Sequence, residues 1–216
     1  MTEPTYDRDF WEQLWARTLS ERGDHVARRP PNSHLTTAVT DLPPGLALDA
    51  GCGHGSETLW LAAHGWRVTA VDFAAAALAQ GRATAEAAGP DVAERIEWVE
   101  ADLGSWKPRL EHYGLVASLH VHVAGSVEEM VRRMAAAVSP GGTLLLVGHL
   151  PIDPSTGAAT RAAGQSQVSV ESATAALDSD AWEFLVAEDR PRAAAGTGAD
   201  AVIQARRRAG VEILQR

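Results

Sequence analysis

The feature that most constrains this chain is a glycine-rich segment, ALDAGCGHG at residues 47–55, which follows an apolar run and precedes a helical stretch. Gly51, Gly53 and Gly55 allow the backbone to turn sharply and allow a ligand to lie directly against it. In open parallel sheets, ligands bind at the carboxyl ends of the strands, near the point where the strand order reverses. The segment therefore predicts an α/β fold with a ligand site at this turn.

From residue 45 the chain alternates short apolar runs with helical stretches, which is the pattern of a parallel sheet with crossover helices. Strands are expected over residues 46–51, 67–73, 96–102, 115–121 and 143–149. Two further runs, 182–188 and 201–207, are separated by a glycine-containing segment and are expected to pair antiparallel. The pattern is typical of a Rossmann-like, doubly wound α/β sheet with helices on both faces.

Local signals predict where the helices begin and end. Ser56 is expected to cap the helix after the glycine-rich segment, and the alanine-rich stretch 74–88 is a strong helix former. Ser126 and Glu129 have the spacing of a capping box. Behind them a buried helix face is predicted by Val127, Met130, Val131, Met134 and Val138. The Pro-Gly-Gly sequence at 140–142 is expected to end this helix.

Acidic residues end the next two predicted strands. Asp72 lies 21 positions after Gly51, where a carboxylate can accept hydrogen bonds from both hydroxyls of a ribose. Asp102 ends the third strand, where it or its neighbouring backbone can meet the amino edge of an adenine. The glycine turn and both acids, in register with three strands, predict a nucleoside-containing ligand.

A nicotinamide dinucleotide is an alternative ligand that fits this pattern less well. Its fingerprint is G-x-G-x-x-G, whereas this chain has G-x-G-x-G and Ser56 stands at the last glycine's place. Asp49, just before the turn, suits a cofactor with an ammonium group better than a pyrophosphate. No G-K-[ST] sequence follows, which excludes a phosphate-binding P-loop.

Three segments carry a resemblance to a known family: LALDAGCGHGSETLWLAAHGWRVTAVDF, then EADL, then SPGGTLLLVGH. Together they resemble the class I S-adenosylmethionine-dependent methyltransferases. The sequences FWEQLWA and RRPPNSHL resemble the bacterial small-molecule branch that includes the tellurite-resistance and thiopurine methyltransferases. The resemblance implies a seven-stranded sheet whose last strand is antiparallel, and S-adenosyl-L-methionine as cofactor, with S-adenosyl-L-homocysteine as product.

The resemblance also implies which residues surround the cofactor. Asp49 would lie near its amino group, Asp72 would hold the ribose, Phe73 and Leu103 would flank the adenine, and His120 would lie beneath the cofactor. The full set expected to bind it is Asp49, Gly51, Cys52, Gly53, Gly55, Asp72, Phe73, Asp102, Leu103 and His120. Trp11 and Trp15 would cover the pocket, although both could equally pack as the apolar face of a helix.

Two motifs of other methyltransferase branches are absent. Enzymes that methylate the amino groups of nucleic-acid bases carry an Asp/Asn-Pro-Pro-aromatic motif after the fourth strand, where this chain reads Leu-His-Val-His-Val at 119–123. The metal-dependent catechol branch has an acidic cluster there, and none is visible in the sequence. We therefore expect neither base methylation nor a metal.

Composition narrows the class of substrate and the location. The formal net charge of -9 and the scattered basic residues disfavour nucleic acid as partner. No apolar run reaches the roughly 18 residues that a membrane span needs, and the N-terminal sequence lacks a signal peptide's apolar region. Cys52 is the single cysteine, which fits a cytoplasmic setting. The oligomeric state stays open.

One domain is expected, in three parts: a helical cap over 1–44, a cofactor-binding core over 45–149, and an acceptor-side segment with the final strand pair over 150–216. The acceptor pocket is expected to be built by residues 1–35 and 150–175. The connection at 150–170 is either a functional loop or a surface excursion.

Methyl transfer from a sulfonium is an in-line displacement that needs no covalent nucleophile. His122 and His149 end the fourth and fifth predicted strands, so either could act as general base for a small-molecule acceptor, and we prefer His122. Both could instead only shape the pocket. Two other functions stay open: a binding module without catalysis, and a methyltransferase for protein or RNA.

Overall fold

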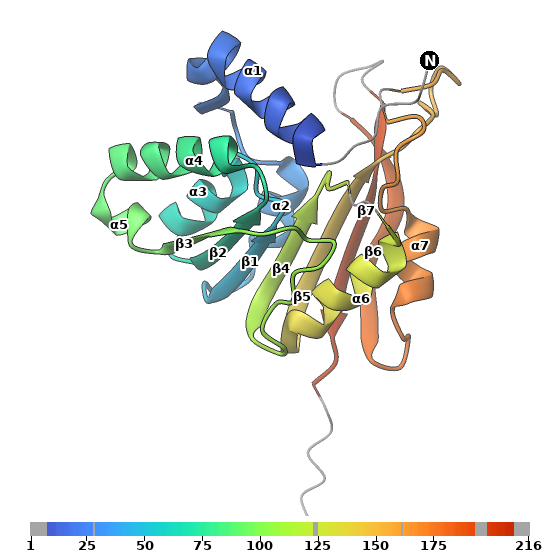
Figure 1. Cartoon of the computed structure of the whole chain (residues 1–216). Helices are drawn as coiled ribbons and strands as arrows, with labels where there is room; N and C mark the ends of the chain where they lie inside the picture. Colours follow the sequence, from blue (N-terminus) through green and yellow to red (C-terminus); the bar gives the residue numbers. More distant parts are fainter. Residues whose placement is uncertain (1–7, 28, 123–124, 161, 193–197, 210–216) are drawn as a thin grey trace, which may run out of the picture.

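A computed structural model of the 216-residue chain describes residues 8–27, 29–122, 125–160, 162–192 and 198–209. Residues 1–7 of the predicted N-terminal cap therefore lie outside the described residues. Seven strands form one sheet in the order β3-β2-β1-β4-β5-β7-β6 (Figure 1). The strands are β1 Leu46–Ala50, β2 Arg67–Asp72, β3 Ile96–Glu100, β4 Tyr113–Leu119, β5 Val138–His149, β6 Trp182–Pro191 and β7 Ala199–Arg207.

The sheet confirms the expected topology. β1 to β5 pair parallel, whereas β7 runs antiparallel to both of its neighbours, β5 and β6. The chain runs outward from β1 through β2 to β3 and then returns to add β4 on the other side of β1. The order therefore reverses between β1 and β4, and the glycine-rich turn leaves β1 at this point.

Helices cover both faces of the sheet (Figure 1). The helices are α1 Arg8–Ala27, α2 Ser33–Ala38, α3 Ser56–Ala63, α4 Ala75–Ala88, α5 Pro90–Ala93, α6 Val127–Ala137 and α7 Val170–Ala176. On one face, Leu35 of α2 and Leu61 of α3 pack with Leu115 and Leu145 of the sheet. On the other, α6 and α7 pack on strand residues such as Leu146. The central strands are thus buried on both sides, which explains their continuous apolar sequences.

The long N-terminal helix α1 lies across one end of the sheet beside α4 (Figure 1). Two polar side chains attach it there. Arg8 donates to the carbonyl oxygen of Phe73 and forms an ion pair with Glu100, and Glu12 accepts a hydrogen bond from the backbone N–H of Ala75 at 2.9 Å. These contacts hold α1 over the carboxyl ends of β2 and β3.

Some predicted boundaries were wrong. The N-cap of α3 is Gly55 in the left-handed conformation, and Ser56 is the first helical residue, hydrogen-bonded to the ring of His54 instead. The start of α6 was predicted correctly: Ser126 is its N-cap and accepts the N–H of Glu129, while its hydroxyl donates to Glu128.

The connection from α6 to β5 also differs from the prediction. α6 ends at Ala137, and Val138 begins β5 rather than extending the buried helix face. The Pro-Gly-Gly sequence lies inside β5, where the pairing with β4 shifts register and Gly141 has a φ of 79°. The Pro-Gly-Gly sequence does interrupt regular structure, but it interrupts the pairing of β5 with β4 and does not end α6.

Two other strands end earlier than predicted. β3 stops at Glu100 and β4 at Leu119, so Asp102 and His120 lie in the loops that follow. His120 has a φ of 57°, a left-handed conformation that cannot continue a strand. Within the part of the chain that the structure describes, no helix is long and apolar enough to cross a membrane.

We predict that Gly81→Ala destabilises the protein, although alanine normally favours a helix by about 1 kcal/mol over glycine. A Cβ at position 81 of α4 would lie 2.7 Å from Cζ3 of Trp98 and 2.9 Å from the carbonyl oxygen of His54. Overpacking of this kind costs about 1–3 kcal/mol, and urea unfolding measures it. Gly45→Ala is the control, because nothing lies within 4 Å of its added Cβ. A Gly81→Ala variant more stable than wild type would contradict the prediction.

Candidate functional site

A cavity of about 390 Å³ lies over the glycine-rich turn, at the carboxyl ends of the central strands. It brings together nearly all residues that the sequence predicted to bind a cofactor. The predicted residues in its wall are Asp49, Gly51, Cys52, Gly53, Asp72, Phe73, Asp102, Leu103 and His120. Gly55 is the exception: a Cβ there would lie 2.6 Å from Cη2 of Trp98, so this glycine serves close packing rather than the cavity wall.

The glycine-rich turn has the sharp backbone turn that its sequence predicted. Gly51 and Gly53 have φ values of 83° and 53°. The N–H groups of Gly51 and Cys52 both donate to the carbonyl oxygen of Val71 on the neighbouring strand. A side chain at position 51 would collide with Val121, so only glycine fits between the turn and the loop after β4.

Asp72 connects this turn to α4. One carboxylate oxygen accepts the N–H of Gly53 at 2.8 Å and the other accepts the N–H of Ala74 at 2.8 Å. Burial raises the pKa of Asp72, while these backbone hydrogen bonds act in the opposite direction. Each oxygen keeps a further lone pair, so the carboxylate can still accept hydrogen bonds from a ligand in the cavity.

Asp49 is almost fully buried at the end of β1. The hydroxyl of Thr58 donates to it at 2.6 Å. Burial, together with the nearby negative charge of Glu57, raises the pKa of Asp49 to about 7. A cationic ligand group beside Asp49 would remove this electrostatic cost.

Asp102 lies on the opposite wall, two residues beyond the end of β3. It is exposed, and its Oδ1 accepts the N–H of Gly104 at 2.7 Å, which holds the loop that carries the buried Leu103. The carboxylate and the apolar side chain thus form one side of the cavity together.

Trp11 and Trp15 of α1 line the cavity and are only partly buried, so they are not core residues. The ring of Trp11 lies 5.0 Å from that of His122, and the ring of Trp15 lies 5.3 Å from that of His54. Trp15 packs on Gly53, where an added Cβ would lie 2.8 Å from the indole. The helix therefore forms an aromatic cover over the glycine-rich turn.

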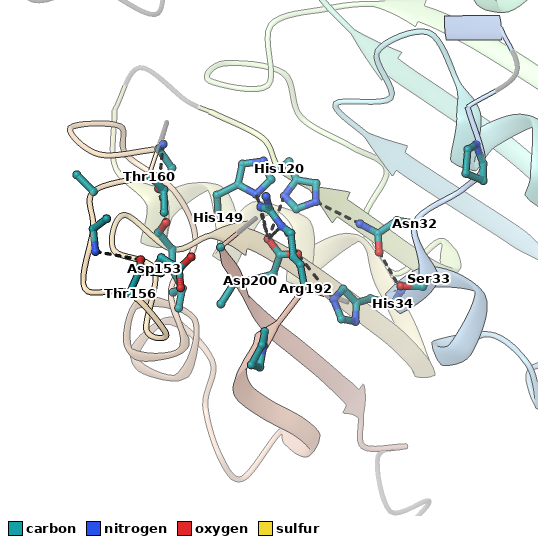
Figure 2. Close-up of a pocket in the computed structure, with 18 of the residues that line it drawn as sticks. Asn32, Ser33, His34, His120, His149, Asp153, Thr156, Thr160, Arg192 and Asp200 are labelled. Carbon is teal, nitrogen blue, oxygen red and sulfur yellow. Dashed lines mark hydrogen bonds and ion pairs between the residues drawn. The ribbon is translucent and has the colours of Figure 1, made fainter. Parts of the chain in front are cut away.

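A second, larger cavity of about 1090 Å³ adjoins the first, and Arg29, His120 and His149 line both. Its wall is formed by the residues before and within α2, the loop after β5, and the ends of β6 and β7 (Figure 2). The loop at 150–170, whose role the sequence left open, thus supplies cavity residues such as Asp153 and Thr160. A compact bridge between Ile152 and Ala159 orders it.

Asp200 is the centre of a polar network at the junction of the cavities (Figure 2). Its carboxylate lies 3.0 Å from Nδ1 of His149, 4.0 Å from Nδ1 of His120 and 3.8 Å from Nε2 of His34. Arg192 forms an ion pair with the same carboxylate at 2.7 Å and also contacts His149. Burial alone would raise the pKa of Asp200, but hydrogen bonds from His149 and Arg192 hold it well below its ordinary value.

His120 lies beneath the junction with a defined tautomer. Asn32 uses its Oδ1 to accept the N–H of His34, so its amide nitrogen must be the group that contacts Nε2 of His120 at 3.2 Å. The proton of His120 is therefore on Nδ1, facing Asp200. Burial and the neighbouring His149, whose ring stacks on it at 3.7 Å, lower the pKa of His120 to about 3.

The two predicted base candidates have different surroundings. His149 ends β5 and lines both cavities. His122 lies three residues beyond β4, lines the smaller cavity and contacts Trp11. Burial, together with His149, lowers the pKa of His122 to about 4.

Sequence reasoning missed Asn32, His34, Arg192 and Asp200. Asp200 faces His149 only because β5 and β7 pair in a register that aligns these two residues. The nitrogen and oxygen atoms of His120, His149 and Asp200 lie within 4.8 Å of one another, a spacing that a metal ion could use. The guanidinium of Arg192 already neutralises this carboxylate, which favours an arginine-compensated network over a metal centre.

Comparison with known proteins adds family evidence to this geometry. Residues 47–142 match the family described as Methyltransferase domain. A curated relative, trans-aconitate 2-methyltransferase from Paracidovorax citrulli, is 32% identical over 136 residues, which cover 61% of this chain and 49% of the relative. The chain thus spans about half the length of this curated relative.

Solved structures with little sequence identity share the fold. TehB from Haemophilus influenzae is 20% identical with a TM-score of 0.65, over 82% of this chain and 63% of TehB. Magnesium protoporphyrin IX methyltransferase from Synechocystis PCC 6803, solved with bound SAM, is 16% identical with a TM-score of 0.65, over 96% of this chain and all of that one. Residues 47–142 thus match a methyltransferase-domain family, and the chain has the fold of solved S-adenosylmethionine-dependent methyltransferases.

Proposed function

We propose that this protein is an enzyme that transfers the methyl group of S-adenosylmethionine to a small-molecule acceptor. The observation that carries the proposal is the pair of adjoining cavities. One lies over a glycine-rich turn with acids suited to a nucleoside, and the other opens beyond His120 and His149. Such an arrangement allows a cofactor and an acceptor to meet at one point.

The residues of the smaller cavity fit the parts of this cofactor. Buried Asp49 suits the ammonium group, the backbone of the glycine-rich turn suits the methionine chain, and Asp72 suits the ribose hydroxyls. Phe73 and Leu103 provide apolar surfaces for an adenine. The bound cofactor would supply an electrophilic methyl group on a sulfonium.

The protein's own contribution would be positioning and exclusion of water. An acceptor in the larger cavity would reach the cofactor at His120 and His149, two of the three described residues that line both cavities. Holding the two reactants in line makes a bimolecular reaction effectively unimolecular, which removes much of its activation free energy. Trp11 and Trp15 would cover the cofactor and keep water from it.

For an acceptor that must lose a proton, we propose His149 as general base, in preference to His122. In this proposal Nδ1 of His149 donates to Asp200, 3.0 Å away, which leaves Nε2 basic. The contact of the same Nδ1 with Arg192 is then not a hydrogen bond, because a guanidinium only donates. Asp200 would also stabilise the imidazolium that forms. A soft acceptor such as a thiol would need no such base.

The net charge of -9 supports a small acceptor rather than RNA, and a cytoplasmic location is part of this proposal. A binding module without catalysis would bind the cofactor yet produce no S-adenosylhomocysteine with any acceptor. A nicotinamide enzyme would bind the dinucleotide instead.

Replacing Asp72 with alanine is expected to weaken the binding of S-adenosylmethionine. Loss of two hydrogen bonds to a charged acceptor, each about 1.5–3 kcal/mol, predicts at least a roughly hundredfold rise in Kd by calorimetry. Glu97→Ala, which removes an exposed carboxylate on the neighbouring strand, is expected to leave the Kd unchanged. Unchanged binding by a folded Asp72→Ala variant would overturn the assignment of the ribose site.

The affinity for S-adenosylmethionine is expected to increase as the pH rises through 7. In the free protein Asp49 is protonated below its pKa of about 7, whereas a bound ammonium group favours the ionised form. The Kd should therefore worsen about tenfold per pH unit below that value. The contribution of Asp49 to the stability of the ligand-free protein is expected to change in the opposite direction. Because the folded state binds this proton more tightly than the unfolded state, that contribution should decline as the pH rises from about 4 to 7.

Calorimetry between pH 5.5 and 7.5, in two buffers of different ionisation enthalpy, measures both affinity and proton release. Asp49→Asn keeps an acceptor for Thr58 and should give a flat profile with no proton release. Equal pH dependence in wild type and variant would assign the titration to another group.

With a hydroxyl acceptor, His149→Gln is expected to lower kcat by about 10²–10⁴-fold, the usual contribution of a general base. His122→Gln should lower kcat less than tenfold and act mainly on KM, since His122 lies only in the cofactor cavity. Formation of S-adenosylhomocysteine against pH measures both effects, and exposed, distant His64→Gln serves as control. A larger loss of kcat in the His122 variant would reverse the assignment.

A further inference from the structure

We infer that the acceptor is an anion, a small molecule with at least one carboxylate that Arg192 and Arg29 bind in the larger cavity. The inference rests on the proposed function and names the substrate class of the same site. It comes from the distribution of charge in the cavity wall (Figure 2).

Among the residues that the structure describes, four with permanently charged side chains line the larger cavity: Arg29, Asp153, Arg192 and Asp200. The two acids are buried, with exposed fractions of 6% for Asp153 and 3% for Asp200. Arg29 is exposed, and the side chain of Arg192 is 33% exposed. The four charges sum to zero, but the guanidinium groups are the more exposed, so a ligand that enters contacts them before the carboxylates.

Internal hydrogen bonds already occupy the two acids. Oδ1 of Asp153 accepts both the backbone N–H and the hydroxyl of Ser155, at 2.8 Å and 2.6 Å, which forms a turn within its own loop. Asp200 accepts from Arg192 and His149. These carboxylates shape the wall but offer little surface to a ligand.

The ion pair with Asp200 gives Arg192 a defined orientation. Nε of Arg192 donates to both carboxylate oxygens, at 3.1 Å and 3.2 Å, and Nη2 donates to one of them. This bidentate contact with Asp200 fixes the plane of the guanidinium. A fixed, planar guanidinium is the group that proteins use most often to recognise a carboxylate.

Two histidines of the wall, His34 and His120, add hydrogen bonds but no charge near neutral pH. Burial, together with the positive charges of Arg190 and Arg192, lowers the pKa of His34 despite the attraction of Asp200. Burial also lowers the pKa of His120. Asn32, Ser33, Thr156 and Thr160 contribute further neutral polar groups. Attraction of an anion therefore depends on the two arginines.

Their positions also match the geometry of transfer. Arg192 lies beside His149, and Arg29 lines both cavities at the junction. An acceptor anchored by its carboxylate on these groups would keep its remaining atoms next to the cofactor cavity. The whole chain carries a net charge of -9, whereas the exposed charged groups of this wall are guanidinium groups, which favours an anion there.

The test measures binding of matched acids and amides to protein saturated with S-adenosylhomocysteine. The probes are succinate, fumarate and benzoate, each paired with its uncharged amide, in calorimetric titrations. The variants are Arg192→Gln and Arg29→Gln. Arg67→Gln is the control, because Arg67 has the same charge but is exposed on β2 and does not line the cavity. Arg192→Gln with Asp200→Asn serves if the single variant does not fold.

We expect at least one acid to bind tenfold or more tightly than its amide. In each cavity variant the ratio of the amide's Kd to the acid's Kd should fall about tenfold, as expected for loss of a charge-assisted hydrogen bond. The control should keep the preference. Equal binding of acids and amides, no binding of any acid at millimolar concentration, or a preference untouched by both variants would overturn the inference.

A measurement of S-adenosylmethionine binding distinguishes failure of this inference from failure of the proposed function. If wild type fails to bind it, the proposed function is wrong. If wild type binds it and Arg29→Gln weakens only that binding, Arg29 serves the carboxylate of the cofactor and not that of the acceptor, which contradicts the role given to Arg29 here.

Discussion

The rest of the site depends on the shape of the turn after β1, because the cavity walls pack against it. Gly51 and Gly53 take left-handed conformations there, and such a turn needs fixed hydrogen bonds if it is to keep one shape. The carboxylate of Asp72 supplies them by joining the N–H of Gly53 to that of Ala74. One side chain thus connects the turn, the end of β2 and the start of α4. Because the strand order reverses at this turn, the cavity lies between the loops that follow β1 and β4. Helix α1 covers this cavity with Trp11 and Trp15.

Asp200 has the corresponding role on the other side of the junction. It lies on the only antiparallel strand among those described, where pairing with β5 sets it opposite His149. The buried charge is compensated by Arg192 and by the histidine rings, so the network stays polar without carrying free negative charge. The first cavity therefore has acids that face a ligand, and the second has acids that support basic groups. This division of charge suits a cationic cofactor on one side and an anionic acceptor on the other.

Much of the fold could be predicted from the sequence, because apolar runs and helical spacing report burial directly. The seven strands were predicted from such local patterns, and Asp72 and Asp102 from their places at strand ends. Cys52, Phe73, Leu103 and His120 were predicted only from the resemblance to a known family. The errors have local physical causes as well: His120 leaves β4 through a left-handed backbone, and Gly55 is small because Trp98 packs against it. Asp200, Arg192 and Asn32 could not be predicted, since their roles depend on strand register and on loops that meet only in three dimensions. The preference for His122 over His149 changed for the same reason.

The account depends on one spatial claim, that a cofactor in the smaller cavity presents its methyl group to the larger one at His120 and His149. A crystal structure of the protein with S-adenosylhomocysteine tests this directly. We expect the ribose hydroxyls within hydrogen-bond distance of Asp72, the amino group beside Asp49, and the sulfur facing the junction of the two cavities. A cofactor whose sulfur points away from that junction, or one bound outside the glycine-rich turn, would contradict the account.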